Sequence, residues 1–376
     1  MSLCSIVTPV FQDSAIFALF LESLWSTIEC ESEVILVNDG SGPAVDDIIE
    51  RYRNRNAHIL VKTTSAQHPR GGATALNKGL RMAAGDTVVI ADSDLILLPG
   101  WQRALLNSLS DSTVGAAGAL LLYPQTGGVQ HCGIAFTEDI GRHLFLNSRR
   151  DDVPNTAFDA QAVVFALCAM RRHIVDAIGE VDEGYFNGYE DLDYMMRIQA
   201  GGWRVILQPQ AVAYHWERSN GVNRASNRKR NLGRFWRQWG TSIRPDLPSH
   251  LVARLGLLST DNEIFTGIDI SRDRPDARLL WKAIGDGVPI SRIEDFSHVT
   301  GQGEEIWLPQ VLGNDGWVMG SRLLILVDNF VQLLGNHYWF EQRRRIREDD
   351  VVIDLYANAL LLQRLRASSW PGTKIR

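Results

Sequence analysis

The sequence is poor in cysteine and has no long apolar segment. Its 376 residues include four cysteines, Cys4, Cys30, Cys132 and Cys168, which lie far apart and form no CxxC pair. Neither a disulfide framework nor a cysteine zinc site is therefore indicated, and a reducing compartment fits best. Nowhere do about 18 uncharged apolar residues follow one another, which argues against a transmembrane helix.

The N-terminal segment does not have the pattern of a signal peptide, and the sequence has no excess of basic charge. No basic segment precedes a long apolar stretch at the N-terminus, so we expect a cytoplasmic protein and leave a peripheral membrane contact open. The net charge of −6 gives the molecule no general attraction for nucleic acid, and we expect no nucleic-acid partner. With 45% hydrophobic and 22% charged residues, the composition is that of a folded globular protein.

Apolar strand-like runs alternate with helix-like segments in the first part of the chain. The strand-like runs cover 3–10, 34–37, 58–62 and 87–91, and apolar residues recur at helical spacing over 15–28, 46–53 and 73–83. This alternation predicts an α/β fold with a mainly parallel sheet flanked by helices. In such sheets, ligands bind at the carboxyl ends of the strands.

The composition changes after Pro245 and Pro248. We therefore predict one domain over 1–244 and a smaller mixed C-terminal domain over 245–376, with strand-like segments at 323–327 and 351–355. The sequence leaves the role of the second domain open between acceptor recognition and dimerisation.

A pair of carboxylates follows the strand-like run 87–91. Asp92 and Asp94 lie two residues apart there and could hold a hard divalent cation, although aspartates are equally common in plain turns. His215 follows another apolar run and is a candidate nitrogen ligand, although a lone histidine is more often structural.

Two further motifs lie at helix starts. Glu190 and Asp191 lie at the start of the helix-like stretch 191–200. Acids there either complement the helix dipole, or one of them acts as a general base beside an acceptor hydroxyl. Gly71 and Gly72 begin another helix, either as a plain cap or to let a ligand approach the backbone. The pattern is not GxGxxG, which disfavours a dinucleotide-binding Rossmann domain.

Together and in order, six segments resemble the family 2 glycosyltransferases, enzymes of the Rossmann-like GT-A fold that transfer a sugar from a nucleotide diphosphate to an acceptor. The segments are 5–11 (SIVTPVF), 37–41 (VNDGS), 72–79 (GATALNKG), 91–94 (ADSD), 188–193 (GYEDLD) and 214–215 (YH). They cover roughly residues 1–240. Residues 130–133 and 235–240 further resemble rhamnosyltransferase-like members.

The resemblance implies a nucleotide site in the first third of the chain. Thr8 and Pro9 would line the nucleotide pocket, and Asp39 would hydrogen-bond the base with Asn38 nearby. The Gly72 turn and Asn77 would border the nucleotide or the donor sugar.

The resemblance also implies a metal and a catalytic pair. Asp94 and His215 would bind Mn²⁺ or Mg²⁺, with Asp92 near the ribose, the sugar or the ion. Asp191 would act as general base, and Glu190 would orient hydroxyl groups.

Two positions depart from the commonest pattern of the family. Asn38 stands where an acid is frequent, and Leu76 stands where an arginine is frequent. The resemblance implies that the missing arginine removes a contact to the diphosphate.

The function that the resemblance implies is a metal-dependent, inverting glycosyltransferase of the hexosyltransferase type. Its expected partners are a nucleotide-sugar donor and a carbohydrate, lipid-linked or small-molecule acceptor, and a homodimer is left open. A sugar nucleotidyltransferase is an alternative, but a glycine-rich basic phosphate loop is missing near the N-terminus. A non-catalytic nucleotide-sugar-binding or assembly protein is a third hypothesis. The presence of a candidate general base argues against it, because a protein that only binds needs no such base.

A basic run extends from Arg218 to Arg237 and includes Arg224 and Arg234. A solvated helix face is the favoured interpretation of such a run. Binding of an anionic acceptor, of the donor diphosphate or of an acidic lipid headgroup is the alternative.

Overall fold

The computed structural model forms two compact units. It describes residues 3–11, 14–53, 55, 60–138, 140–216, 222–256, 258, 264–272, 274–295, 322–330, 340, 343, 344, 347 and 349–364, without the side chains of 222–226 and 274. The first unit comprises Met1–Ile134 and Arg150–Ile243, and the second comprises Ala135–Arg149 and Arg244–Arg376. The domain boundary predicted after residue 244 stays a prediction. The sequence did not indicate that the segment Ala135–Arg149, called the excursion below, belongs to the second unit.

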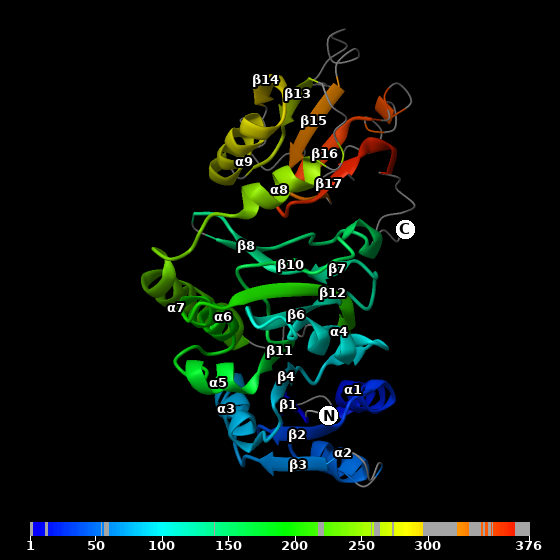
Figure 1. Ribbon diagram of the computed structural model, residues 1–376, viewed down its shortest axis with the longest axis vertical. Coiled ribbons are helices and arrows are strands. Elements are labelled where there is room, and N and C mark those ends of the chain that lie inside the picture. The colour runs from blue at the N-terminus through cyan, green and yellow to red at the C-terminus, as the bar shows by residue number, and fades with distance from the viewer. Residues whose placement is uncertain are drawn as a thin grey trace. The chain divides into compact units, whose positions relative to one another are not determined.

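The first unit alternates strands and helices (Figure 1). In chain order its elements are β1 (Cys4–Val10), α1 (Ser14–Thr27), β2 (Ser32–Asn38), α2 (Pro43–Arg53), β3 (Leu60–Ser65), α3 (Gly72–Met82), β4 (Thr87–Ala91), β5 (Leu95–Leu97), α4 (Trp101–Ser108), β6 (Val114–Leu122), β7 (Val129–His131), the 3-10 helix η1 (Arg150–Asp152), β10 (Phe158–Asp159), β11 (Leu167–Arg171), α5 (Arg172–Ile178), α6 (Glu190–Ala200), β12 (Arg204–His215) and α7 (Val222–Trp239).

These strands form one large sheet in the order β10-β12-β6-β11-β4-β1-β2-β3, with β5 beside β12 and β7 beside β6. The strands β3, β2, β1 and β4 run parallel, whereas β11 is antiparallel to both of its neighbours. β2 is buried along its whole length, as expected for a strand covered on both faces. The predicted α/β fold, with a mainly parallel sheet flanked by helices, is confirmed.

Helix α3 packs very closely on this sheet. A Cβ atom at Gly79 would lie 2.3 Å from Val7 Cγ1 and 3.1 Å from Val37 Cγ2. Only glycine therefore fits at this position of the helix. The close packing fixes the N-terminus of α3 near the carboxyl ends of β1 and β2.

The second unit has its own sheet. Its elements are β8 (Ile134–Phe136), which starts at the last residue of Met1–Ile134, β9 (Gly141–His143), α8 (Leu247–Gly256), β13 (Phe265–Asp269), α9 (Arg274–Gly287), β14 (Ile290–Asp295), β15 (Arg322–Val327), β16 (Val351–Asp354), β17 (Ala359–Leu361) and the 3-10 helix η3 (Leu362–Arg364). The sheet order is β14-β13-β15-β16-β17, with the first four strands parallel and β17 antiparallel. The strands predicted at 323–327 and 351–355 are confirmed as β15 and β16.

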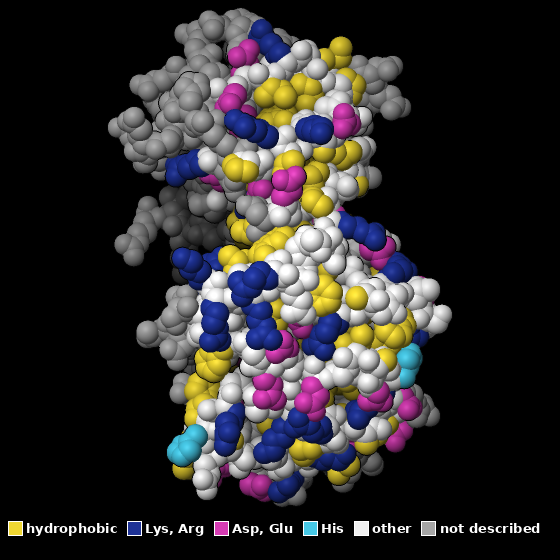
Figure 2. Space-filling model, turned by 90° about the vertical axis from the view of Figure 1, so that its left-hand side faces the viewer, with side chains coloured by type: hydrophobic (Ala, Val, Ile, Leu, Met, Phe, Trp, Pro, Cys, Tyr) yellow, Lys and Arg dark blue, Asp and Glu magenta, His cyan; other side chains and the backbone are white. Residues whose placement is uncertain are grey.

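The surface carries charges of both signs. On the face drawn in Figure 2, Lys and Arg side chains are interspersed with Asp and Glu side chains. Within the described part of the chain, every helix is too short or too polar to cross a membrane.

Candidate active site

The backbone brings Asp94 and His215 together although they are far apart in sequence. The loop of Asp92 and Asp94 joins β4 to β5, and β12 runs antiparallel to β5 so that His215 pairs with Leu95. The N–H of Trp216 also donates to the Asp94 carbonyl oxygen at 3.2 Å. The last residue of β12 is thereby fixed beside the acidic loop.

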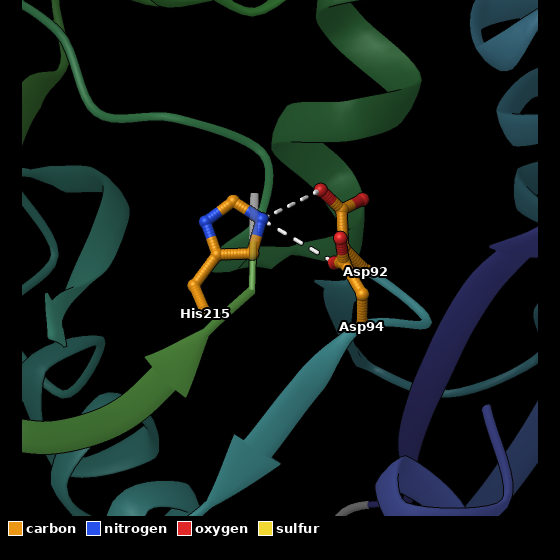
Figure 3. A group of neighbouring side chains, drawn as sticks. All are labelled: Asp92, Asp94 and His215. Carbon is orange, nitrogen blue, oxygen red and sulfur yellow. Dashed lines mark ion pairs between the residues drawn. The ribbon is translucent and has the colours of Figure 1, made fainter. Parts of the chain in front are cut away.

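The side chains of these residues point toward one another (Figure 3). His215 Nε2 lies 3.3 Å from Asp94 Oδ1 and 4.0 Å from Asp92 Oδ2. One ligand atom from each residue lies within 4.8 Å of the other two. Two carboxylate oxygens and one imidazole nitrogen suit Mn²⁺, and all three side chains are partly exposed, so that a ligand can approach. The residues fit a divalent cation.

Gln130 on β7 sets the orientation of the histidine ring. Its Oε1 lies 2.7 Å from His215 Nδ1, and its Nε2 donates to the His215 carbonyl oxygen at 3.2 Å. Because an amide oxygen only accepts hydrogen bonds, Nδ1 carries a proton, which leaves Nε2 as the nitrogen that can bind a metal ion between the acids. The sequence placed 130–133 only in a family resemblance and missed this contact, which depends on the pairing of β7 with β6 and of β6 with β12.

The second pair of acids lies at the start of α6. Glu190 Oε2 accepts the Gly188 N–H at 2.6 Å. Burial, followed by the negative charges of Asp191 and Asp92, raises the pKa of Glu190 to about 7, although backbone hydrogen bonds oppose the shift. Asp92 and Asp191 therefore both lie within electrostatic range of Glu190. The acids at the start of α6 are therefore electrostatically coupled to Asp92 in the loop after β4.

The third acid of this motif has a structural role. Asp193 is buried, accepts a hydrogen bond from Arg197 Nε at 2.9 Å, and accepts another from Trp239 Nε1 at 2.8 Å. Asp191 is only half-buried, and its Oδ1 accepts the Leu192 N–H at 2.8 Å. Asp191 is therefore the better placed of the two to meet a ligand.

Helix α7 holds the loop that leads into α6. Asn231 Nδ2 donates to the carbonyl oxygens of Phe186 and Gly188 at 3.0 and 2.9 Å. Asn187 and Tyr189 in this loop have φ values of 52° and 75°, and the left-handed conformation is costly for an aromatic residue such as Tyr189.

Arg234 of the same helix reaches further back along the chain. Its Nη2 lies 2.5 Å from Asp182 Oδ2, and its guanidinium lies 4.8 Å from the centre of the Tyr185 ring. In the basic run, Arg228, Lys229, Arg230 and Arg237 are exposed, whereas Arg218 and the side chain of Arg224 lie outside the described residues. The basic run thus has an exposed face, and its Asn231 and Arg234 hold the segment 182–188 by hydrogen bonds.

The predicted nucleotide residues at the end of β2 hold loops in place. Both carboxylate oxygens of Asp39 accept backbone N–H groups, from Arg70 at 2.8 and 3.0 Å and from Gly71 at 2.8 Å. Asn38 donates to Asp46 Oδ1 at 2.7 Å and accepts the Ser41 N–H at 2.9 Å. Asp39 thereby positions the turn before α3, and its contact to a base stays a prediction.

Asn77 has a similar structural role. It is completely buried, and its amide exchanges hydrogen bonds with the N–H and C=O of Val181 at 2.8 and 2.9 Å and donates to Glu183 Oε1 at 3.0 Å. These bonds tie α3 to the segment before α6. The place predicted for Asn77 beside the donor is not visible in this arrangement and stays a prediction.

The pocket role predicted for Thr8, Pro9 and Gly72 stays a prediction. Thr8 is fully buried, and its Oγ1 has no hydrogen-bond partner within the described residues, whereas Pro9 is half-buried. Gly72 is exposed, and a Cβ atom there would lie 4.0 Å from Asn187 Oδ1, while one at Gly71 would lie 3.3 Å from Phe186 Cε2. The N-terminus of α3 therefore faces the loop that α7 supports.

The comparison with known families agrees with this arrangement. Residues 5–179 match the family model described as Glycosyl transferase family 2. This part of the chain is similar to family 2 glycosyltransferase domains. The match ends before Glu190 and His215, so the structure alone connects those residues to the matched part.

Relatives and solved structures extend the comparison. Uncharacterized protein y4gI of Sinorhizobium fredii is 24% identical over 254 residues, which are 63% of this chain and 26% of the relative. The O-antigen biosynthesis protein RfbC of Myxococcus xanthus is 26% identical over 194 residues, which are 49% of this chain and 15% of RfbC. The chain thus spans only a minor part of the length of these curated relatives.

The fold matches a solved glycosyltransferase. The mannosyltransferase PcManGT from Pyrobaculum calidifontis, in complex with GDP-Man and Mn²⁺, has a TM-score of 0.50 at 18% identity, covering 76% of this chain and 80% of that chain. At this level of identity the likeness concerns the fold alone, and it confirms the predicted GT-A fold.

Proposed function

We propose that this protein is a metal-dependent, inverting glycosyltransferase that moves a hexosyl group from a nucleotide-diphosphate donor to an acceptor hydroxyl. The observation that carries the proposal is the meeting of Asp92, Asp94 and His215 at the carboxyl end of β4 in a domain similar to family 2 glycosyltransferases. The donor and the Mn²⁺ in the complex of PcManGT give further support.

The metal site acts on the leaving group. Asp94 and His215 would hold Mn²⁺ or Mg²⁺, with Asp92 as third ligand or beside the ribose, and the bound ion supplies Lewis-acid stabilisation of the departing diphosphate. Gln130 keeps the Nε2 lone pair of His215 directed at the site. Thr8, Pro9, Asn38, Asp39, Gly72 and Asn77 are proposed to form or support the nucleotide pocket.

The acids of α6 act on the acceptor. Asp191 removes the proton of the acceptor hydroxyl as its oxygen attacks the anomeric carbon, and one in-line displacement inverts that centre. Glu190, with its pKa near neutrality, is partly protonated and orients a sugar hydroxyl by hydrogen bonding.

A panel of nucleotide sugars, with nucleotide-activated rhamnose included because of the resemblance at 130–133 and 235–240, tests the proposal. We expect Mn²⁺-dependent donor turnover that is lost with a chelator and in Asp94→Asn. Asp191→Asn should keep donor binding but lower turnover about 10²- to 10⁴-fold. Asp47→Asn, which removes an exposed carboxylate on α2, is the matched control and should behave as wild type.

The products separate the alternatives. A glycosyltransferase releases a nucleoside diphosphate and inverts the anomeric configuration, which NMR of the product reports. Release of pyrophosphate instead indicates a nucleotidyltransferase, and thermal stabilisation by donors without turnover indicates a binding protein. Full turnover with a chelator present would refute the metal assignment. Full turnover in Asp191→Asn would refute the assignment of Asp191 as the base.

A further inference from the structure

The sheet of the second unit has a topological switch point. From β13 the chain passes through α9 to β14 on one side, whereas β15 pairs with β13 on the other side. In open parallel sheets, ligands bind in the crevice at the carboxyl ends of the two strands where the order reverses. Those ends are followed by residues 270–272 and 328–330.

A pocket lies at that place. Its volume is about 520 Å³, and its lining includes Arg272 and Pro275 after β13, Asp328 and Asn329 after β15, Tyr356 after β16, and Arg142 from the excursion. All of these residues belong to the second unit. The volume lies in the range of pockets that hold small molecules and cofactors, roughly 300 to 1,000 Å³.

The wall that carries Tyr356 is fixed from two sides. The Asp354 carboxylate accepts the Tyr356 N–H and the Asn358 amide, both at 2.9 Å, across a tight turn in which Ala357 has a φ of 58°. On the other side, the Phe145 N–H donates to the Tyr356 carbonyl oxygen at 2.9 Å. The aromatic ring is therefore presented by a preformed turn.

Two arginines of the pocket have different environments. Arg142 is buried, donates from Nε to Asp276 Oδ2 at 2.9 Å, and lies 5.5 Å from the centre of the Tyr356 ring. The side chain of Arg272 is 49% exposed, and its Nε forms a long ion pair with Asp328 Oδ2 at 3.9 Å without a hydrogen bond, while Asp328 Oδ1 accepts the Arg272 N–H at 2.5 Å. Arg142 is thus a fixed part of the wall, whereas the guanidinium of Arg272 can turn to a ligand.

The start of α9 adds a second attraction for anions. The helix Arg274–Gly287 has 14 residues, and its second residue, Pro275, lines the pocket but offers no N–H, so that the N–H groups of the first turn come from its neighbours. The N–H groups and the dipole of a helix N-terminus favour phosphate. Asp276 in the first turn would oppose this, but Arg142 compensates its charge.

We propose that this pocket is a second ligand site, which binds a phosphorylated small molecule with a ring and hydroxyl groups, such as a nucleotide or a sugar phosphate. The phosphate meets Arg272 and the N-terminus of α9. The ring lies against Tyr356, and Asp328 and Asn329 receive the hydroxyl groups. The proposal does not depend on the transferase activity of the other unit.

Calorimetric titration of the full chain tests the site. In the Asp94→Asn background with a chelator present, UMP, GMP, glucose 1-phosphate and inorganic phosphate are titrated separately. We expect saturable binding of one equivalent that Arg272→Ala weakens about tenfold or more, since a charge-assisted contact is lost. Arg278→Ala, an exposed arginine of α9 outside the pocket, should leave binding unchanged.

A second variant and the choice of ligands complete the test. Tyr356→Ala should also weaken binding, and Arg272→Ala decides the question if Tyr356→Ala fails to fold, because the Arg272 side chain is exposed. Binding of UMP or GMP without glucose 1-phosphate identifies a nucleotide site, and the reverse identifies a sugar-phosphate site. No binding at millimolar ligand, equal affinity for inorganic phosphate, or an affinity unchanged in Arg272→Ala would overturn the proposal.

Discussion

At the residue scale, the pairing of Gln130 with His215 determines which nitrogen faces the acids. A neutral histidine ring can carry its proton on either nitrogen. The amide oxygen at Nδ1 favours the tautomer whose Nε2 can bind a metal ion. A residue outside the ligand set therefore controls what the set can bind.

We expect Gln130→Leu to weaken Mn²⁺ binding about 10- to 100-fold while the protein stays folded, the usual effect of removing a partner of a metal ligand. Calorimetric titration with Mn²⁺ measures the change. Gln210→Leu is the control, because Gln210 is an exposed glutamine on the same strand as His215. Equal Mn²⁺ affinities of Gln130→Leu and wild type would exclude the orienting role.

Glu190 makes stability depend on pH in a defined direction. Its pKa is raised to about 7 in the folded state, so the folded protein binds this proton more tightly than the unfolded chain does. The contribution is complete below about pH 4.5 and is lost as the pH rises toward 7. Between these values wild type should lose stability relative to Glu190→Gln, in which this position does not titrate.

Urea denaturation of wild type and Glu190→Gln from pH 4.5 to 8 measures this difference. Asp354, whose pKa burial also raises to about 7, is present in both proteins and cancels in the comparison. A difference in unfolding free energy that is independent of pH would contradict the shift.

At the element scale, α7 supports the loop that leads into α6, where Glu190 and Asp191 lie. Its Asn231 and Arg234 bind residues on both sides of Gly184, and Trp239 holds Asp193 inside α6. A Cβ atom at Gly184 would lie 2.0 Å from Arg234 Nη1. Glycine at this position leaves the space in which the guanidinium lies.

Gly184→Ala should therefore displace Arg234 and reproduce the effect of Arg234→Ala. Because only the end of a flexible side chain moves, we expect a stability loss below about 1 kcal/mol but a drop in turnover of roughly tenfold or more, since the acids are misplaced. Steady-state kinetics of both single variants and of the double variant measure this. The double variant should be no worse than either single one, and additive losses would show that the two residues act separately.

At the scale of the whole molecule, each compact unit has a core of its own. The first is built around β1, β2 and β4, and the second around β13, β15 and β16, whose residues are almost all buried. Units of this size with separate cores commonly unfold as separate transitions.

Calorimetry should accordingly resolve two transitions. In the Arg272→Ala background, in which the pocket of the second unit is weakened, a nucleotide sugar with Mn²⁺ at about 100 times its dissociation constant should stabilise only the first unit, by roughly 2.7 kcal/mol. Ile325→Ala, at a fully buried position of β15, should lower only the other transition, since the truncation costs about 2 to 5 kcal/mol. One transition that both changes shift together would contradict independent unfolding.

The local pattern of the sequence was sufficient for the elements that precede the site. The strand expected at 87–91 is β4 residue for residue, and Asp92 and Asp94 follow it as the periodicity indicated. Continuous apolar runs bounded by polar residues mark strands buried on both faces, whatever the rest of the chain does. The α/β class and the acids at the strand end therefore follow from the sequence by itself.

Only the tertiary structure decided which distant residues meet those acids. Strand β12 extends as far as His215, because a register shift between Gln208 and Val212 lets it pass Pro209 and then pair with β5. Gln130 reaches His215 through the adjacent strands β7, β6 and β12, and Ala135–Arg149 joins the second unit. Such contacts arise from sheet pairing between residues that are distant along the chain, which the periodicity of a single segment does not encode.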